Sequence, residues 1–321
     1  MKILIIPGLT LPEVPEQDLA RIQKAAGHNA QIVITDHKDA GDHAADAEII
    51  LGFVPKPLFM AAPKLRWVQS ISSGVDMFFY PEFIDSDVVL TSEKGLVGEH
   101  LADHAFGLLL MLTRQLATAL RHGPDSWNHR PEMRYQEIEL TGAILGIFGF
   151  GGTGRAMARR GAAFGMNCIA LDRDPVPPSD EVQQVWPSER LPELLATSDV
   201  LCICCPLTNE TRDLLNHEAF LTMKESAYLV NVTRGEVMDE EALVDALQTG
   251  KIRGAALDVA PREPLPADSA LWSMPNVVMT PHTAGASQYR MARNLDRFVN
   301  NLERYTTDQP LVGMIDKELG Y

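Results

Sequence analysis

The stretch ILGIFGFGGTGRAMARRGAAFGMNCIALD (residues 144–172) decides the fold class of this chain. It opens with ILGIFGF (144–150), an apolar run with the length of a buried strand, and RAMARRGAAFG (155–165) follows the glycines as a helix. NCIALD (167–172) is a second strand-like run. A strand, a glycine turn, a helix and a strand in this order predict a parallel sheet covered by helices.

Strand-like runs alternate with amphipathic stretches along the whole chain, in two series. The first series is KILIIP (2–7), AQIVITD (30–36), AEIILGF (47–53), LRWVQSI (65–71) and VVLTS (88–92). The second is ILGIFGF, NCIALD, VLCICCP (200–206), AYLVNVT (227–233), GAALDV (254–259) and VVMTP (277–281). The sequence therefore predicts an α/β chain with two doubly wound parallel sheets, divided near residues 100 and 286.

Composition and charge narrow the class of protein. The chain has 321 residues, of which 45% are apolar and 22% are charged, as in folded globular proteins with room for two domains. A net charge of −15 disfavours nucleic acid and anionic membranes as partners, because they repel an acidic surface. The N-terminal MKILIIPGLTLPEVPEQ lacks the pattern of a signal peptide, which predicts a cytoplasmic location.

HLADHAFGLLLMLTRQLATAL (100–120) is the one stretch that resembles a membrane span. Asp103, His104 and Arg114 leave too short an uncharged run to cross a bilayer, so we interpret the stretch as a buried helix. We interpret the histidines on or beside it, which are His100, His104 and His122, as structural.

The four cysteines fall on predicted core strands. Neighbouring thiols in LCICC (201–205) point to opposite faces of a strand, and no second CxxC or histidine pair follows. We therefore expect buried thiols and no metal site; the residues are Cys168, Cys202, Cys204 and Cys205.

The glycines of residues 149–154 predict a dinucleotide site. Gly149, Gly151 and Gly154 have the GxGxxG spacing, directly after a strand and before a helix. The backbone amides of Gly152 and Thr153 would then face a pyrophosphate at the N-terminus of that helix.

Asp172 ends the next strand, where an acid can bind the ribose hydroxyls of NAD and repel the extra phosphate of NADP. Arg173 beside it could tolerate that phosphate, so the sequence favours NAD(H) and leaves NADP(H) open.

Arg234, Glu263 and His282 are the candidate catalytic residues, and each follows a different predicted strand. Reduction of a 2-oxo acid needs a proton donor with a pKa near neutrality, which histidine supplies and a carboxylate partner orients. A guanidinium can pair with the substrate carboxylate and polarise the carbonyl. Singly, each could be a surface arginine, a loop carboxylate or a turn histidine, but the carboxyl ends of parallel strands are where α/β sheets bind ligands.

These motifs together resemble the D-isomer-specific 2-hydroxyacid dehydrogenase family, and the resemblance extends over nearly the whole chain. The segments that carry it are GFGGTG (149–154), PLTNETRDLLN (206–216), LVNVTRGEVMDEEAL (229–243), GAALDVAPREPL (254–265) and PNVVMTPHTAG (275–285). The C-terminal PLVGMIDKELGY matches the short branch of the family, in which glyoxylate and hydroxypyruvate reductases are found.

The resemblance implies an architecture and further site residues. A Rossmann NAD-binding domain (101–285) would be inserted into a flavodoxin-like substrate domain (1–100 and 286–321), the active site would lie between the domains, and a homodimer would form through the 100–120 helix. The substrate carboxylate would bind the backbone amides of Ser73, Gly74 and Val75 in the loop SSGVD. Asp258 would bind the nicotinamide amide, and the remaining cofactor contacts would be Pro206, Thr208, Thr211 and Thr233.

The sequence thus predicts an NAD(H)-dependent enzyme that interconverts a small 2-oxo acid, similar to glyoxylate or hydroxypyruvate, and its D-2-hydroxy acid. Two alternatives remain open: a dehydrogenase for an unusual substrate, and a dimeric NAD-sensing protein similar to the corepressors of this family. Glu263 disfavours formate, because the formate-oxidising relatives have a neutral amide at that position.

Overall fold

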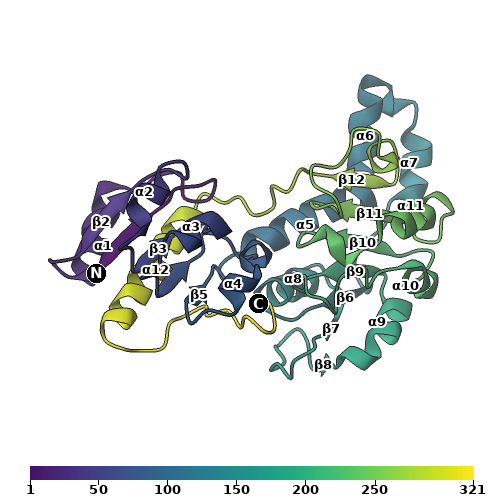
Figure 1. Ribbon diagram of the computed structural model, residues 1–321. Helices are drawn as coiled ribbons and strands as arrows, with labels where there is room; N and C mark the ends of the chain where they lie inside the picture. The colour runs from purple at the N-terminus through teal and green to yellow at the C-terminus, as the bar shows by residue number, and fades with distance from the viewer. The chain divides into compact units, whose positions relative to one another are not determined.

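In the computed structural model, which describes residues 1–321, the chain forms two compact units (Figure 1). The first comprises residues 1–97 and 286–321, and the second comprises residues 98–285; the sequence predicts the division at residues 100 and 286. Each unit contains one sheet in which all strands are parallel, so the predicted α/β class with two parallel sheets is confirmed.

The first unit is built on a five-stranded sheet in the order β2-β1-β3-β4-β5. Every strand lies within a predicted run: β1 (Lys2–Ile5), β2 (Gln31–Ile34), β3 (Ile49–Leu51), β4 (Trp67–Gln69) and β5 (Val89–Thr91). Its helices are α1 (Glu16–Ala26), α2 (Ala40–Ala44), α3 (Lys56–Met60), η1 (Asp76–Phe78), α4 (Pro81–Ile84) and α12 (Arg290–Thr306).

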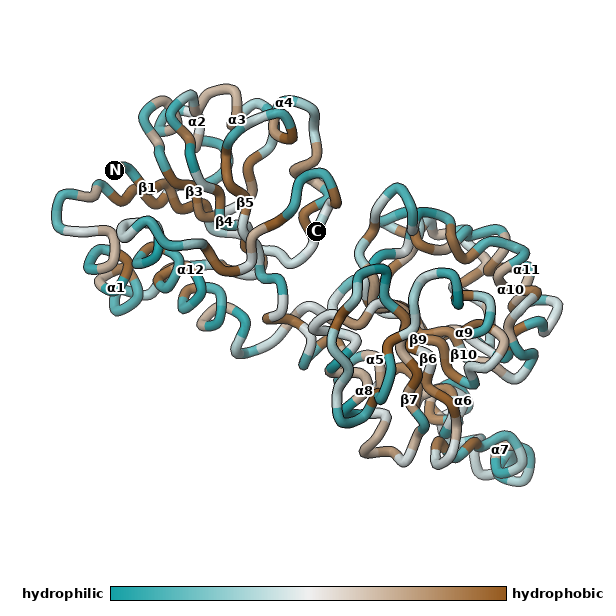
Figure 2. Tube along the Cα trace, turned by 90° about the horizontal axis from the view of Figure 1, so that it is seen from below, coloured by the Kyte–Doolittle hydropathy of each residue, from teal (hydrophilic) through white to brown (hydrophobic).

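Successive side chains of these strands enter two separate apolar clusters, because strand residues alternate between faces. Ile3 and Ile49 pack with α1 and α12, whereas Leu4 and Ile50 pack with α2, α3 and α4. Figure 2 shows the apolar strands between these two layers of helices.

The second unit is built on a seven-stranded sheet in the order β12-β11-β10-β9-β6-β7-β8. Its strands are β6 (Ile144–Phe148), β7 (Asn167–Leu171), β8 (Val185–Trp186), β9 (Val200–Ile203), β10 (Tyr228–Asn231), β11 (Gly254–Leu257) and β12 (Val277–Met279). Strand β8 lies outside the predicted runs, because it has only two residues at the sheet edge and no apolar run marks it.

Helices cover both faces of this sheet as well. Side chains of α5 (Gly98–Thr113) and α8 (Gly152–Ala163) share one apolar cluster, and those of α9 (Leu191–Thr197), α10 (His217–Thr222) and α11 (Glu240–Gln248) share the other. The short 3-10 helices are η2 (Gly123–Trp127), η3 (Ser188–Arg190), η4 (Gly235–Val237) and η5 (Ala270–Trp272).

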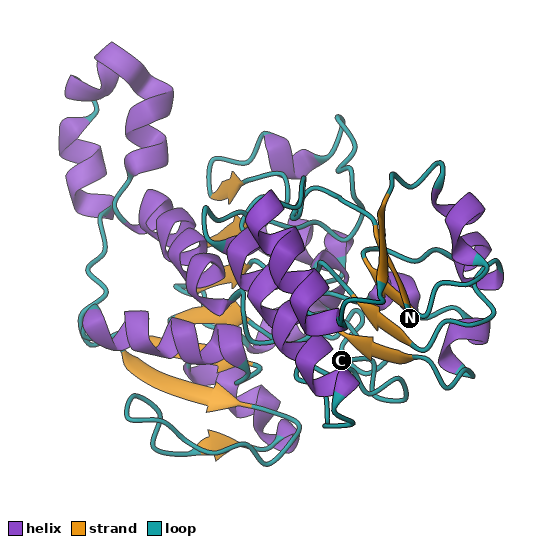
Figure 3. Ribbon diagram, turned by 90° about the vertical axis from the view of Figure 1, so that its left-hand side faces the viewer, coloured by secondary structure: helices purple, strands orange, loops and turns teal.

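The predicted single helix over 100–120 is wrong. Helix α5 ends at Thr113, and α6 (Leu116–His122) begins after Gln115, whose φ of 54° is left-handed. The Gln115 side chain donates to the carbonyl of Leu112 at 3.1 Å, which stabilises the break. Helices α6 and α7 (Arg130–Gln136) stand away from the sheet of the second unit (Figures 1 and 3). No helix of the chain has both the length and the apolar character needed to cross a membrane.

The cysteine assignment needs a partial correction. Cys168 and Cys202 lie on strands, but Cys204 and Cys205 lie beyond the end of β9. The Cys204 amide still donates to the carbonyl of Phe148 at 2.7 Å, which is the last hydrogen bond of the β6–β9 ladder. All four thiols are free, and burial raises the pKa of Cys168 to about 11 and that of Cys205 to about 12.

A buried ion pair joins the C-terminal helix to the sheet of the first unit. Arg290 of α12 contacts Glu93, which follows β5 and has a side chain only 1% exposed, at 2.5 Å. Asn294 donates to the same carboxylate at 2.9 Å. Loss of one partner would leave a buried charge without its counterion.

Glu93→Ala is therefore expected to lower the free energy of unfolding by about 3–5 kcal/mol, measured by urea unfolding followed by circular dichroism. The matched control is Asp296→Ala, which removes the Asp296–Arg21 pair, 2.6 Å long and 62% and 47% exposed. An exposed pair contributes about 1 kcal/mol or less. Equal losses in both variants would show that the buried pair has no special role.

Candidate active site

The three candidate catalytic residues follow three neighbouring strands of the second unit. Arg234 follows β10, Glu263 lies in the segment after β11, and His282 follows β12. Parallel strands place their carboxyl ends at one edge of the sheet, so the three segments leave the sheet side by side. The charges of Glu263 and Arg234 both act on His282, and the structure therefore brings the predicted triad together.

His282 and Glu263 form a direct hydrogen-bonded pair. Nδ1 of His282 lies 2.7 Å from Oε2 of Glu263, and the side chains are 45% and 39% exposed. This hydrogen bond is the main reason why the pKa of His282 is raised, while partial burial and the Arg234 charge oppose the rise. With Nδ1 engaged, Nε2 is the nitrogen that can exchange a proton with a ligand.

Glu263 remains a carboxylate in this setting. Partial burial, the largest influence, acts to raise its pKa, but the hydrogen bond from His282, the Ala260 amide and the charges of His282 and Arg234 lower it overall. The Ala260 N–H donates to Oε1 at 3.1 Å, so both carboxylate oxygens are held in place. A fixed, charged Glu263 can orient the imidazole and favour its protonated form.

The turn that carries His282 rests on Asp258. One oxygen of this buried carboxylate accepts from the Thr280 hydroxyl at 2.6 Å and the Thr283 amide at 2.9 Å, and the other accepts from the Ala284 amide at 2.8 Å. These bonds hold His282 at its left-handed φ of 54°. Asp258 thus has a structural role that the sequence analysis missed, and its predicted contact with nicotinamide stays a prediction.

A second support of this turn comes from helix α5. Nε2 of His104 lies 2.7 Å from the Thr280 hydroxyl and 3.4 Å from Oδ1 of Asp258. The sequence analysis assigned His104 a structural role but gave no sign of this contact, because 176 residues separate His104 from Thr280. Thr280 itself could have been suspected from its place directly after β12.

Arg234 is positioned by a close approach between two loops. A Cβ on Gly235 would lie 1.9 Å from the backbone carbon of Ala260, so only glycine lets the loop after β10 pack on the loop that carries Glu263. Buried Asn231, which ends β10, donates to the Arg234 carbonyl at 2.9 Å and accepts from the Thr233 amide at 3.0 Å. The Arg234 guanidinium donates to the Thr233 carbonyl at 2.8 Å.

The glycine loop has the shape that a dinucleotide requires. Gly149 has a φ of 98°, and a Cβ there would lie 2.5 Å from the Cys205 amide nitrogen. A Cβ on Gly154 would lie 2.1 Å from the Gly149 carbonyl oxygen, whereas a Cβ on Gly151 would have no atom within 4 Å. The tight turn thus leaves open space at Gly151, directly before α8 begins at Gly152, which fits a pyrophosphate at a helix N-terminus.

Asp172 is tied to this glycine loop. Its Oδ2 accepts from the Phe150 amide at 2.6 Å, and its Oδ1 accepts from the Asp174 amide at 3.0 Å. The neighbouring Arg173 guanidinium lies 3.4 Å from carboxylate oxygens of both Asp174 and Glu210. Three carboxylates therefore surround the predicted ribose site, and two of them are paired with the Arg173 guanidinium.

The remaining predicted cofactor residues lie at the same sheet edge. Thr211 stabilises the turn that follows β9. Its hydroxyl donates to the Pro206 carbonyl and accepts from the Thr208 amide, both at 2.8 Å. Thr233 follows β10, and its hydroxyl lies 3.2 Å from Oδ1 of Asn231. The structure thus brings these residues to the edge that carries the glycine loop and the triad.

The predicted carboxylate-binding loop lies in the first unit, after β4. The backbone N–H groups of Ser73, Gly74 and Val75 donate to no other group of the chain, although Val75 is buried. Ser73 and Gly74 are half-exposed, so this row of successive free backbone donors is accessible to an anion.

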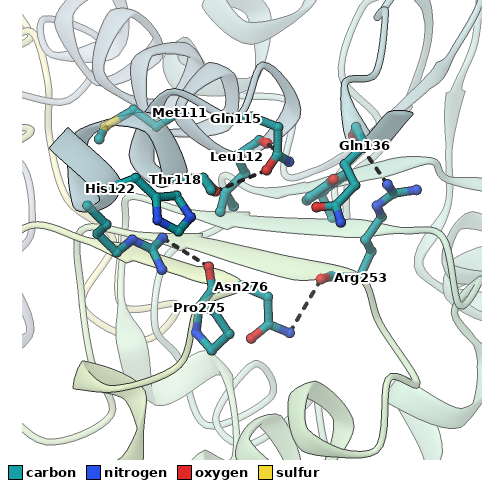
Figure 4. Close-up of a pocket in the computed structure, with 11 residues that line it drawn as sticks. Met111, Leu112, Gln115, Thr118, His122, Gln136, Arg253, Pro275 and Asn276 are labelled. Carbon is teal, nitrogen blue, oxygen red and sulfur yellow. Dashed lines mark hydrogen bonds between the residues drawn. The ribbon is translucent and has the colours of Figure 1, made fainter. Parts of the chain in front are cut away.

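A pocket of about 440 Å³ lies elsewhere in the second unit (Figure 4). Its lining includes Tyr228, which begins β10, and Arg253 and Asn276, which precede β11 and β12. It therefore sits at the amino ends of the strands and contains none of the predicted site residues.

Comparison with known proteins agrees with this geometry. The family model described as D-isomer specific 2-hydroxyacid dehydrogenase, NAD binding domain, matches residues 106–284. The chain is 32% identical over 324 residues to a glyoxylate reductase of Korarchaeum cryptofilum, with 96% of this chain and 95% of the relative covered. It is 38% identical over 304 residues to a glyoxylate/hydroxypyruvate reductase B of Escherichia fergusonii, with 91% and 92% covered.

A solved structure shows the same fold over the whole chain. The D-isomer specific 2-hydroxyacid dehydrogenase from Xanthobacter autotrophicus Py2, in complex with NADPH and MES, is 28% identical and has a TM-score of 0.82. The match covers 99% of each chain.

Glu263→Gln tests whether the Glu263 carboxylate raises the pKa of His282. The variant removes the negative charge that raises the pKa of His282, so that pKa is expected to fall and His282 to lose its proton at lower pH. NMR titration of the histidine ring protons, with His282→Ala to assign the signal, measures the change. Asp245→Asn, beside the exposed His217 at 3.7 Å, is the matched control and leaves His282 unchanged. A His282 titration identical in wild type and Glu263→Gln would refute the coupling.

Proposed function

Because the chain belongs to the D-isomer-specific 2-hydroxyacid dehydrogenase family of oxidoreductases, we propose that it interconverts a glyoxylate- or hydroxypyruvate-like 2-oxo acid and the D-2-hydroxy acid, using NAD(H). The observation that carries the proposal is the 2.7 Å hydrogen bond between His282 and Glu263, which raises the pKa of His282. The substrate choice is supported by the names of the two relatives, both reductases of such acids.

His282 acts as the general acid during reduction. Negative charge builds on the carbonyl oxygen as the carbonyl carbon is reduced, and Nε2 of the imidazolium donates a proton to that oxygen. Glu263 keeps the ring oriented through Nδ1 and stabilises its positive charge. In the oxidative direction the neutral imidazole accepts the proton of the hydroxyl group.

Arg234 binds the substrate through its guanidinium. A planar guanidinium forms paired hydrogen bonds with a carboxylate and can polarise an adjacent carbonyl, which a lysine cannot do equally well. The free N–H groups of Ser73, Gly74 and Val75 are the second proposed set of carboxylate donors.

The glycine loop and Asp172 are the proposed cofactor site. When bound, the nicotinamide supplies or accepts the hydride. The open space at Gly151 supports a pyrophosphate at the N-terminus of α8, and the turn from Pro206 to Thr211 lies at the same edge. We propose NAD(H) as the preferred form, because the Asp172 carboxylate would repel a 2′-phosphate, and Asp174 and Glu210 engage the Arg173 guanidinium that could otherwise bind it. The relative from Xanthobacter is in complex with NADPH, so the fold also accommodates the phosphorylated cofactor.

Asp172→Asn tests this preference, because the amide retains an oxygen for the Phe150 N–H and removes the charge. A single repulsion between unit charges about 4 Å apart is worth about 1–4 kcal/mol between bulk water and a protein surface. The ratio of kcat/KM with NADH to kcat/KM with NADPH is therefore expected to fall by at least about fivefold. A wild-type enzyme that prefers NADPH would contradict the proposal, and so would an unchanged ratio in the variant.

His282→Ala tests the acid role in the complete reaction. Oxidation of NADH and NADPH is followed by absorbance with glyoxylate, hydroxypyruvate, pyruvate, 2-oxoisocaproate and phenylpyruvate. The variant is expected to lower kcat by about two to four orders of magnitude, since general acid catalysis contributes that much, while NADH binding is retained.

His217→Ala is the matched control, because His217 is exposed and also lies beside a carboxylate, Asp245. It is expected to retain wild-type turnover. Normal turnover in His282→Ala would refute the acid role. No turnover of any of the five acids by the wild-type protein, with NADH binding intact, would refute the proposed substrate class.

A further inference from the structure

We propose that His122, Asp125 and His129 form a binding site for a divalent transition-metal ion such as Zn²⁺, separate from the active site. His122 ends α6, Asp125 lies in η2, and His129 directly precedes α7. All three lie in the segment from α6 to α7, the two helices that stand away from the sheet of the second unit (Figure 3). The proposal departs from the sequence analysis, which expected no metal site and interpreted His122 as structural.

The three side chains already converge. One potential ligand atom from each residue lies within 4.8 Å of those of the other two. The imidazole rings of His122 and His129 stack with their centroids 3.9 Å apart, and Nε2 of His129 lies 3.1 Å from Oδ2 of Asp125. Asp125 is exposed and both histidines are half-buried, so solvent reaches the cluster; binding one ion would require the stacked rings to rotate until a nitrogen of each faces it.

The side chains of Glu132 and Asn128 contact the potential ligands His129 and Asp125. In metal sites, hydrogen bonds of this kind orient the ligating side chains. Oε2 of Glu132 lies 3.4 Å from Nδ1 of His129. It can therefore accept a hydrogen bond from Nδ1–H, which would leave the lone pair of Nε2 for a metal ion. The Asn128 amide donates to Oδ1 of Asp125 at 2.6 Å, which leaves Oδ2 facing His129. A carboxylate behind a ligating histidine is a regular feature of metal sites.

The donor set determines the class of ion. Two imidazole nitrogens and one carboxylate oxygen suit Zn²⁺ and its first-row neighbours, whereas Mg²⁺ and Ca²⁺ prefer oxygen ligands alone. With three protein ligands, water would complete the coordination. An ion held by His122, Asp125 and His129 would tie the end of α6 to the start of α7 and so order the intervening turn.

The test is a calorimetric titration of the metal-free full-length protein with ZnCl₂. We expect one ion per chain in the wild type. His122→Ala, His129→Ala and Asp125→Asn are each expected to weaken binding by more than about tenfold, and Glu132→Gln by about tenfold, the scale at which loss of an outer partner acts. Zn²⁺ is also expected to raise the Tm of the wild type and not that of His122→Ala.

Two control variants distinguish this site from other histidines that could bind Zn²⁺. His217→Ala removes an exposed histidine that also lies beside a carboxylate, and His282→Ala removes the active-site imidazole. Both are expected to retain the ion. CoCl₂ provides the spectroscopic check, because nitrogen and oxygen ligands give only weak visible bands, whereas thiolate ligands add strong near-ultraviolet absorption.

Zn²⁺ binding that is equal in the wild type and in all three ligand variants would overturn the proposal. So would binding lost only in His282→Ala, or a thiolate band with Co²⁺. A wild-type protein that binds no Zn²⁺ would show that His129 forms only surface ion pairs with Asp125 and Glu132. Circular dichroism of each variant establishes that a loss of binding is not a loss of folding.

Discussion

Parallel strand pairing is the constraint on which the site in the second unit depends. Every strand of its sheet runs in the same direction, so the segments after β6, β7, β9, β10, β11 and β12 all leave at one edge. The glycine loop, Asp172 and the triad come from regions of sequence up to 133 residues apart, from Gly149 to His282, and still meet there. An antiparallel arrangement of the same strands would send alternate loops to the opposite edge.

The charged groups at this edge differ in burial, and this difference determines how each one behaves. Asp258 is buried, but two backbone amides and the Thr280 hydroxyl hydrogen-bond its oxygens, with His104 nearby. His282 and Glu263 are only half-buried, so their mutual hydrogen bond can outweigh desolvation and favour the charged form of each: the pKa of His282 is raised and that of Glu263 is lowered. The buried carboxylate therefore holds the backbone, and the half-buried pair is the one that we propose for proton exchange.

The strands and the glycine loop could be predicted, because each has a local pattern in the sequence. Eleven apolar runs each contain a strand of the structure. The glycines at 149 and 154 were identified from their spacing between a predicted strand and a predicted helix, and close backbone contacts require them. Features without a local pattern were missed. Gln115 adopts a left-handed conformation that normally favours glycine, so nothing in LTRQLAT marks the end of α5. The contact between His104 and Thr280 joins residues too far apart in sequence for any spacing rule.

Close backbone approach explains why glycine and small side chains recur around the site. Gly235 lets the loop of Arg234 lie on the backbone of Ala260, and Ala260 in turn donates its amide to Glu263. A methyl group at Gly235 would separate these loops and move the guanidinium away from the carboxylate at the same time. The relative position of the three proposed catalytic groups is thus fixed mainly by backbone contacts: Gly235 against Ala260 for Arg234, the Ala260 amide for Glu263, and the amides bound by Asp258 for His282.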